Sequence, residues 1–174
     1  MAYLVIAYPD LASSDLQRIQ AYRKEHDPLY YQVVDPHFTL VFPVFDLERA
    51  DFLAEAHRLL HGVQKFDFVL RCATINKDSF SDFFHILLVP DEGYSKIVKL
   101  HDRLYSGLFR ENLRLDIDFI PHIGIGNSLD KFVCKAMVDH WNSEPFEIKG
   151  RISSIDIIEF DDNKVTTIEK IDLA

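Results

Sequence analysis

The sequence predicts an α+β fold that is duplicated into two pseudo-symmetric lobes, each an antiparallel β-sheet flanked by helices. Two short apolar segments carry one histidine each, close behind a proline: Pro36–Pro43 (PHFTLVFP) and Pro121–Gly126 (PHIGIG). A helix-like segment follows each of them, and matching strand-like segments come next. Pseudo-symmetry would bring equivalent histidines to face each other, so we expect the active-site cleft between the lobes.

The two histidine segments have the alternation of half-buried strands. Successive side chains of a strand point to opposite faces. We therefore expect His37, Thr39 and Val41 on one face, with the apolar residues between them in the core. In the second segment, His122 and Gly124 take the positions of His37 and Thr39. The histidine face is expected to be open in both.

The segments after the two histidines repeat an order of strand, helix, strand and strand. Residues 66–75 (FDFVLRCATI) match residues 146–155 (FEIKGRISSI), with Phe, Arg and Ile at the same places. This internal match predicts a single domain over 1–174. Its His37 half covers roughly 27–90 and its His122 half roughly 111–174, with strands intermixed between them.

The first half of the chain has recognisable helix and strand signals. A buried strand is expected over 2–8. Apolar residues at helical spacing predict a helix that is capped by Ser13 or Ser14 and runs to about residue 26. After the first histidine strand, Asp46 is expected to cap a helix over 47–62, which has a broad apolar stripe.

In the second half of the chain, segments with helical spacing of apolar residues again alternate with strand-like segments. Apolar side chains spaced three and four apart predict two helices, with Ser128 as the cap of the later one. The last two strands are joined by an Asp-Asp-Asn turn. The expected elements are strands over 66–76 and 83–89, a helix over 93–109, a helix over 129–142 and a closing hairpin of 146–160 and 164–172.

Composition limits the classes of partner. The net charge of −9 argues against an extended nucleic-acid-binding surface, although it allows a local pocket for one phosphate. The acidic charge therefore favours a partner that is small or that binds through one end. The only two cysteines, Cys72 and Cys134, have no metal-ligand spacing, which favours a reducing, cytoplasmic setting. No apolar run is long enough to span a membrane. We also expect the protein to be a monomer and to need no cofactor or metal.

Two histidines across one cleft suit phosphodiester chemistry. Histidine has an unperturbed pKa of about 6.5, so it gives or takes a proton near neutral pH. Hydrolysis needs a base for the attacking water and an acid for the departing oxygen, and His37 and His122 are candidates for these catalytic roles. Thr39 would donate to a phosphoryl oxygen. Gly124 has no hydroxyl, so it either makes room for substrate or marks lost chemistry.

The segments His-Phe-Thr-Leu and His-Ile-Gly-Ile resemble those of the two-histidine (2H) phosphoesterases. This superfamily includes bacterial 2'-5' RNA ligase-like proteins and cyclic nucleotide phosphodiesterases, and its pattern is two His-x-Thr/Ser motifs. His37, Thr39 and His122 match the pattern, whereas Gly124 departs from it. The resemblance covers nearly the whole chain. It implies metal-free opening of 2',3'-cyclic phosphates or cleavage of related phosphodiesters on RNA ends or nucleotides.

Two functional hypotheses stay open at this point. The first is a metal-independent phosphodiesterase that takes part in RNA processing. The second is a nucleotide- or RNA-end-binding module with reduced or lost catalysis, because Gly124 replaces the second Thr/Ser of the family pattern. A scaffold for protein contacts has no positive support in the sequence.

Several other residues are candidates for substrate binding. Tyr8 and two tyrosines of the loop that precedes His37 are candidates for stacking on a base. The alternative is that these rings only pack in the core or the loop. His85 lies in a strand expected near the cleft. It is interpreted either as a partly buried structural histidine or as a residue that contacts substrate. His57 and His61 have a spacing that suits zinc but lack a third ligand, so we expect a solvated helix face.

Overall fold

The computed structural model describes residues 1–174. The strands are β1 (Ala2–Ala7), β2 (Asp10–Leu11), β3 (Phe38–Val44), β4 (Phe66–Lys77), β5 (Phe84–Glu92), β6 (Ile123–Ser128), β7 (Ile148–Ile152), β8 (Ser154–Asp161) and β9 (Lys164–Asp172). The helices are α1 (Ser13–His26), α2 (Arg49–Leu60), α3 (Tyr94–Leu104), α4 (Lys131–Asn142) and the 3₁₀ helix η1 (Gly107–Asn112).

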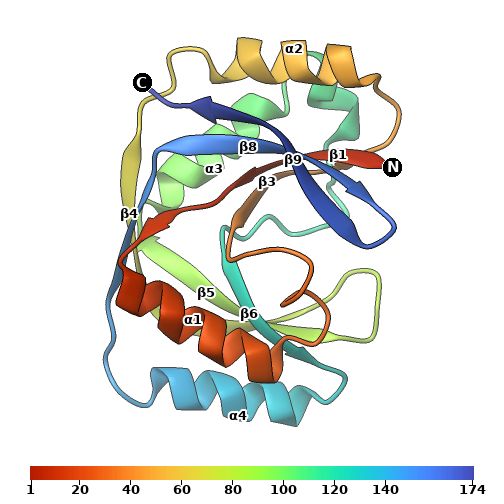
Figure 1. Ribbon diagram of the computed structural model, residues 1–174. Coiled ribbons are helices and arrows are strands. Elements are labelled where there is room, and N and C mark those ends of the chain that lie inside the picture. Colours follow the sequence, from red (N-terminus) through yellow and green to blue (C-terminus); the bar gives the residue numbers. More distant parts are fainter.

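The strands form two antiparallel sheets (Figure 1). The first sheet has the order β3-β1-β8-β9, and the second has the order β2-β7-β4-β5-β6. Helices α2 and α3 lie beside the first sheet, and α1 and α4 lie beside the second. This arrangement confirms the predicted α+β class with two lobes. None of the helices combines the length and apolar composition that crossing a membrane requires.

Apart from β2, η1, β7 and β9, the elements recur in the same order in two series, β1-α1-β3-α2-β4 and β5-α3-β6-α4-β8. Each sheet takes strands from both series, because β8 lies beside β1 and β4 lies beside β5. Helix α1 packs against β6, and α3 packs against β3. Each of these helices thus covers the histidine strand of the other series. The division of one domain at 27–90 and 111–174 stays a prediction.

Helix starts differ from the sequence predictions. Neither α1 nor α2 begins with a side-chain cap, so the capping roles predicted for Ser13, Ser14 and Asp46 are wrong. Helix α4 is capped by Asp130, whose carboxylate accepts a hydrogen bond of 2.8 Å from the backbone N–H two residues later. The predicted cap, Ser128, is the last residue of β6 instead.

Two of the predicted elements are divided. The strand expected over 146–160 breaks at Ser153, where the chain leaves the second sheet as β7 and enters the first sheet as β8. The helix expected over 93–109 ends at Leu104, and a 3₁₀ turn follows. Gly107 begins that turn with a φ of +59°, a conformation that favours glycine and that a continuing helix excludes.

The two glycines of β6 have different surroundings. A Cβ atom at Gly126 would lie 3.0 Å from the backbone oxygen of His26, at the end of α1, and 3.3 Å from its Cβ. A Cβ atom at Gly124 would meet no atom within 4 Å. Gly126 therefore permits α1 to approach the sheet closely, whereas Gly124 faces open space.

We expect Gly126→Ala to be less stable than Gly124→Ala by about 1–3 kcal/mol, because only the first substitution overpacks a helix against a strand. Both changes restrict the unfolded chain alike, so this comparison removes that contribution. Urea unfolding of the two variants gives the difference. Equal unfolding free energies would show that α1 yields to the added methyl group.

Candidate active site

Both histidines are held by the same local hydrogen bond. His37 Nδ1 lies 2.7 Å from the backbone oxygen of Asp35, and His122 Nδ1 lies 2.5 Å from that of Ile120. A carbonyl oxygen only accepts, so Nδ1 carries the proton in each ring. The other ring nitrogen, Nε2, is therefore left free to take a proton in both neutral imidazoles.

Both histidine strands also carry a β-bulge at the third residue after the histidine. From Thr39 to Val41, β3 advances two residues while β1 advances one, so Leu40 is the extra residue. In β6 the extra residue is Ile125, by the same count against β5. The bulge reverses the alternation, and Val41 is completely buried. The prediction that Val41 shares the face of His37 is therefore wrong.

Thr39 and Gly124 occupy equivalent positions, between the histidine and the bulge of their strands. Both residues are half-buried, as are the two histidines, whereas the residues between them are buried. Thr39 lies opposite Ile6 in β1, so its side chain is on the side of the sheet away from α2 and α3. The pattern of exposure from His37 to Val41 is repeated from His122 to Gly126.

The two imidazoles lie close enough to influence each other. Burial lowers the pKa of His37 to about 4, and the neighbouring charge of a protonated His122 contributes to this shift. Burial also lowers the pKa of His122, with a smaller contribution from His85. Both rings are therefore neutral at pH 7. A bound phosphodiester anion would raise both pKa values, because a nearby negative charge favours the protonated form.

Tyr8 and Asp156 extend the site along the first sheet. The ring of Tyr8 is edge-on to His37, with centroids 6.2 Å apart. Burial, assisted by the charges of Asp156 and Asp35, raises the pKa of the Tyr8 hydroxyl to about 12. Asp156 is only 4% exposed, and its Oδ2 has no hydrogen-bond partner. Burial raises the pKa of this carboxyl group.

Asp156 was missed by reasoning from the sequence. The available signal was a single acidic residue inside the otherwise apolar run from Ile155 to Ile158. An acid in a fully buried strand is rare unless it is paired or serves a site. In β8 it lies opposite Ile6 of β1, one strand further from His37 than Tyr8.

A small pocket lies beside Tyr8, between the loop before His37 and strand β9. Its volume is about 260 Å³. The lining residues are Tyr8, Tyr31, Gln32, Val33, Val34, Asp35, Val165 and Thr167. Tyr8 and Tyr31, two of the tyrosines considered for base stacking, thus share one pocket, and Tyr8 also contacts the ring of His37.

His85 is brought near His122 and is held by an acidic partner. Its Nε2 lies 2.9 Å from Oδ2 of Asp78. The other oxygen of Asp78 accepts hydrogen bonds from two backbone N–H groups of the β4–β5 loop. The ring of Tyr30 lies 6.2 Å from that of His85, between centroids. Asp78 therefore fixes both the loop and the imidazole at this side of the site.

A buried polar network joins the two histidine strands. Arg23 of α1 donates to Oδ2 of Asp27 at 3.0 Å and to the backbone oxygens of Tyr30 and Val34 at 3.1 and 2.8 Å. Asn127 of β6 donates to the other oxygen of Asp27 at 2.6 Å. The loop that precedes His37 is thereby tied to the strand that begins beside His122.

Several other charged side chains are engaged in ion pairs. Arg71 forms ion pairs with three surface carboxylates, and Arg151 pairs with Asp67 at 2.6 Å. The Nε2 of His57 lies 2.5 Å from a carboxylate oxygen of Glu169 in β9. No group of three or more His, Cys, Asp or Glu side chains has an arrangement that suits a metal ion.

Most of the chain matches a known family of sequences. The family model described as 2'-5' RNA ligase superfamily matches residues 8–164. The chain belongs to the 2'-5' RNA ligase superfamily. Members of this superfamily, the two-histidine phosphoesterases, are enzymes. The predicted resemblance to the two-histidine phosphoesterases is thus confirmed at the level of the superfamily. No significant match is found among curated proteins.

Solved structures show the same fold over the whole chain. The protein TT0787 of Thermus thermophilus has a TM-score of 0.63 and 14% identity, covering 99% of this chain and 98% of its own. Escherichia coli LigT complexed with 3'-AMP has a TM-score of 0.62 and 15% identity, with the same coverage. Kluyveromyces marxianus Usb1 has a TM-score of 0.58 and 11% identity, again with 99% and 98% covered.

We expect the imidazole of His37 to titrate near pH 4 in the free protein, because burial and the neighbouring His122 disfavour its charge. Inorganic phosphate should move the midpoint upward. An NMR titration of the ring protons measures both, with His37→Gln to assign the signal. The unfolded state takes up this proton at about pH 6.5, so stability should fall as pH decreases from 6.5 to 4. A midpoint near 6.5 would contradict the prediction.

Proposed function

We propose that this protein is a metal-independent phosphodiester hydrolase acting on 2',3'-cyclic phosphates or related phosphodiesters of nucleotides and RNA ends. One observation carries the proposal. Two neighbouring imidazoles have their Nδ1–H groups bound to carbonyl oxygens, which leaves both Nε2 atoms available for proton transfer. His37 and His122 would be the catalytic pair.

The reaction needs one neutral and one protonated histidine. The neutral ring takes a proton from water as its oxygen attacks phosphorus, and the protonated ring gives a proton to the departing ribose oxygen. The bond from phosphorus to that oxygen breaks, and a phosphomonoester remains. The free protein holds both rings neutral, and the charge of the bound phosphodiester favours protonation of one. The equivalent hydrogen bonds of the rings make either assignment of base and acid possible.

Charge that develops on the phosphoryl oxygens needs hydrogen-bond donors. We propose Thr39 for this role, because it follows His37 on the same exposed side of β3. Gly124 supplies no hydroxyl, but it leaves the equivalent position open. Tyr8 and His85, which flank His37 and His122, are the proposed substrate contacts.

Small nucleotides are the proposed substrates. Structures of Escherichia coli LigT, which shares the fold, contain 3'-AMP, NADP+, ATP or phosphate. The pocket beside Tyr8 has two tyrosine side chains on its lining, and one of them, Tyr8 itself, lies edge-on to His37, which suits a base next to the reacting phosphate.

A second proposed function is binding of nucleotides or RNA ends with reduced catalysis. The open position at Gly124 is the specific observation in its favour, because the second donor hydroxyl of the family pattern is lacking there. Nucleotide affinity in calorimetry without product formation would favour this alternative.

We expect His37→Ala and His122→Ala each to reduce turnover of a 2',3'-cyclic nucleotide by about 10²–10⁴-fold, as loss of a general acid or base does. The assay contains EDTA, and product is measured by chromatography. His57→Ala, on the surface of α2, is the matched control and should retain activity. Unchanged turnover in either of the first two variants would exclude the paired mechanism.

We expect Gly124→Ser to raise the turnover number by about tenfold, because one well-placed donor is worth at least this much in related transition states. The added side chain meets no atom within 4 Å of its Cβ, so the fold should accommodate it. Gly124→Ala is the control that adds the methyl group without the hydroxyl. Equal turnover of the two variants would show that no oxyanion develops beside this position.

A further inference from the structure

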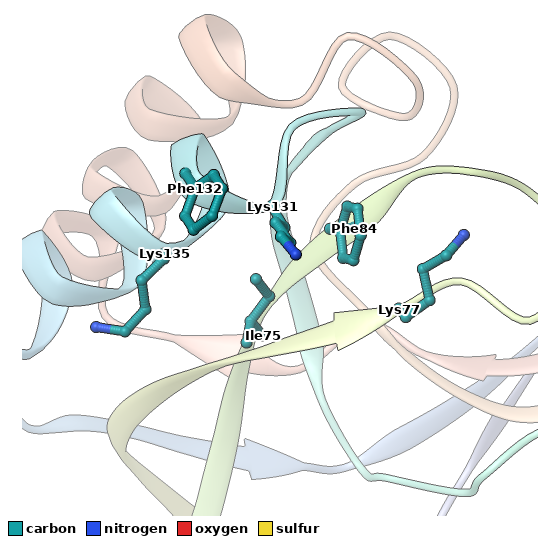
Figure 2. A pocket seen from close by; sticks show the side chains of 6 residues that line it. All are labelled: Ile75, Lys77, Phe84, Lys131, Phe132 and Lys135. Atoms are coloured by element: carbon teal, nitrogen blue, oxygen red, sulfur yellow. The ribbon is translucent and has the colours of Figure 1, made fainter.

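A groove lies on the second sheet beside the start of α4, and neither His37 nor His122 lines it (Figure 2). Its volume is about 380 Å³. It is lined by Ile75, Lys77, Phe84, Lys131, Phe132 and Lys135. The side chains come from β4, β5 and the first turns of α4, so three separate elements build it.

The groove alternates basic and aromatic side chains. The Nζ of Lys77 lies 5.4 Å from the ring centroid of Phe84, and that of Lys131 lies 5.1 Å from the ring of Phe132. Phe132 is 73% exposed although it is a large apolar side chain. In a chain with a net charge of −9, three lysines in one groove are a local exception to the overall charge.

Acidic side chains next to the groove form exposed ion pairs with its lysines, and a phosphate group of a ligand can replace them. Asp82 lies 3.7 Å from the Nζ of Lys77 and is 98% exposed, and Asp139 pairs with Lys135 from the outer surface of α4. Asp130 accepts a backbone hydrogen bond as the cap of α4. Exposed ion pairs contribute little energy, so a phosphate group replaces such a carboxylate at little cost.

The combination of lysines with one exposed ring, Phe132, and one half-buried ring, Phe84, matches a single-stranded nucleic acid. Such strands are bound by lysine and arginine at the phosphates and by aromatic side chains at the bases. An acidic peptide would satisfy the lysines but has no repeated planar group for Phe84 and Phe132. The chemistry of the groove therefore favours nucleic acid over an acidic protein segment.

The groove is placed where a strand leaving the two histidines would reach it. Phe84 lies opposite Ser128, which is the end of β6 farthest from His122. The rise of strand from His122 to Ser128 is roughly 20 Å. Strand β6 is the edge of its sheet, so the RNA would pass around this edge, beyond the contacts that β6 makes with α1 and with Asp27.

We propose that this groove binds the body of a single-stranded RNA whose 3' end occupies the site of His37 and His122. The inference rests on the proposed function and narrows the substrate class to oligonucleotides. A mononucleotide or dinucleotide is too short to span both places, so only longer strands use the groove.

Binding of fluorescein-labelled oligouridylates with a 3'-phosphate tests the inference, by anisotropy on the full chain. A strand of about twelve nucleotides, within the usual site sizes, is compared with a dinucleotide. The double variant Lys131→Glu/Lys135→Glu should weaken binding of the long strand at least about tenfold, and Phe132→Ala about fivefold or more. Neither should alter dinucleotide binding. Lys96→Glu/Lys99→Glu, at two exposed lysines of α3, is the charge-matched control.

Each outcome decides between defined alternatives. Long and short strands of equal affinity, or a Lys131→Glu/Lys135→Glu variant that binds like the Lys96→Glu/Lys99→Glu control, overturn the groove assignment. Displacement of the long strand by oligoglutamate at an equal concentration would assign the groove to acidic peptides and also overturn it. Turnover of a cyclic mononucleotide is measured on the same variants. Its absence in the wild-type protein contradicts the proposed function alone, while groove binding is still read from the long strand.

Discussion

The buried contact between Arg23 and Asp27 is the constraint on which the geometry of the site depends. These side chains are 2% and 3% exposed, so removing either one leaves a buried charge without its partner, at a cost of about 3–5 kcal/mol. The same pair holds two backbone carbonyls of the loop before His37, and Asn127 joins it from β6. The relative positions of the two histidine strands therefore follow from one network rather than from contacts between the histidines themselves.

The pseudo-symmetry of the two histidine strands explains why both imidazoles have the same hydrogen bond and the same charge state. In each strand a proline separates the histidine from the carbonyl that binds its Nδ1, and a bulge follows at the third residue. Burial then holds both rings neutral, which suits a base but not an acid. The anionic substrate supplies the missing condition, since its charge favours one protonated ring. The surroundings differ at Thr39 and Gly124, and there the two halves of the site cease to be equivalent.

The sequence predicted the fold class and the two histidine strands because alternation and repetition are local signals. The predictions failed where contacts between segments far apart in the sequence determine the structure. The break at Ser153 arises because the chain there changes sheets, and the burial of Val41 arises from a bulge set by pairing with β1. The network of Arg23 was not predicted, since its partners come from a loop and from β6. The groove beside Phe132 likewise requires β4, β5 and α4 together, which no single stretch reveals.

The interleaving of the two sheets has a consequence for synthesis on the ribosome. Strand β1 pairs on one side with β3, but its other neighbour is β8, and Ala2 lies opposite Phe160. One edge of β1 therefore has no partner in the nascent chain until β8 has left the exit tunnel. An exposed strand edge is a site of mispairing between chains. Protection of β1 during translation, by a chaperone or by fast elongation, should thus govern the yield of correctly folded protein.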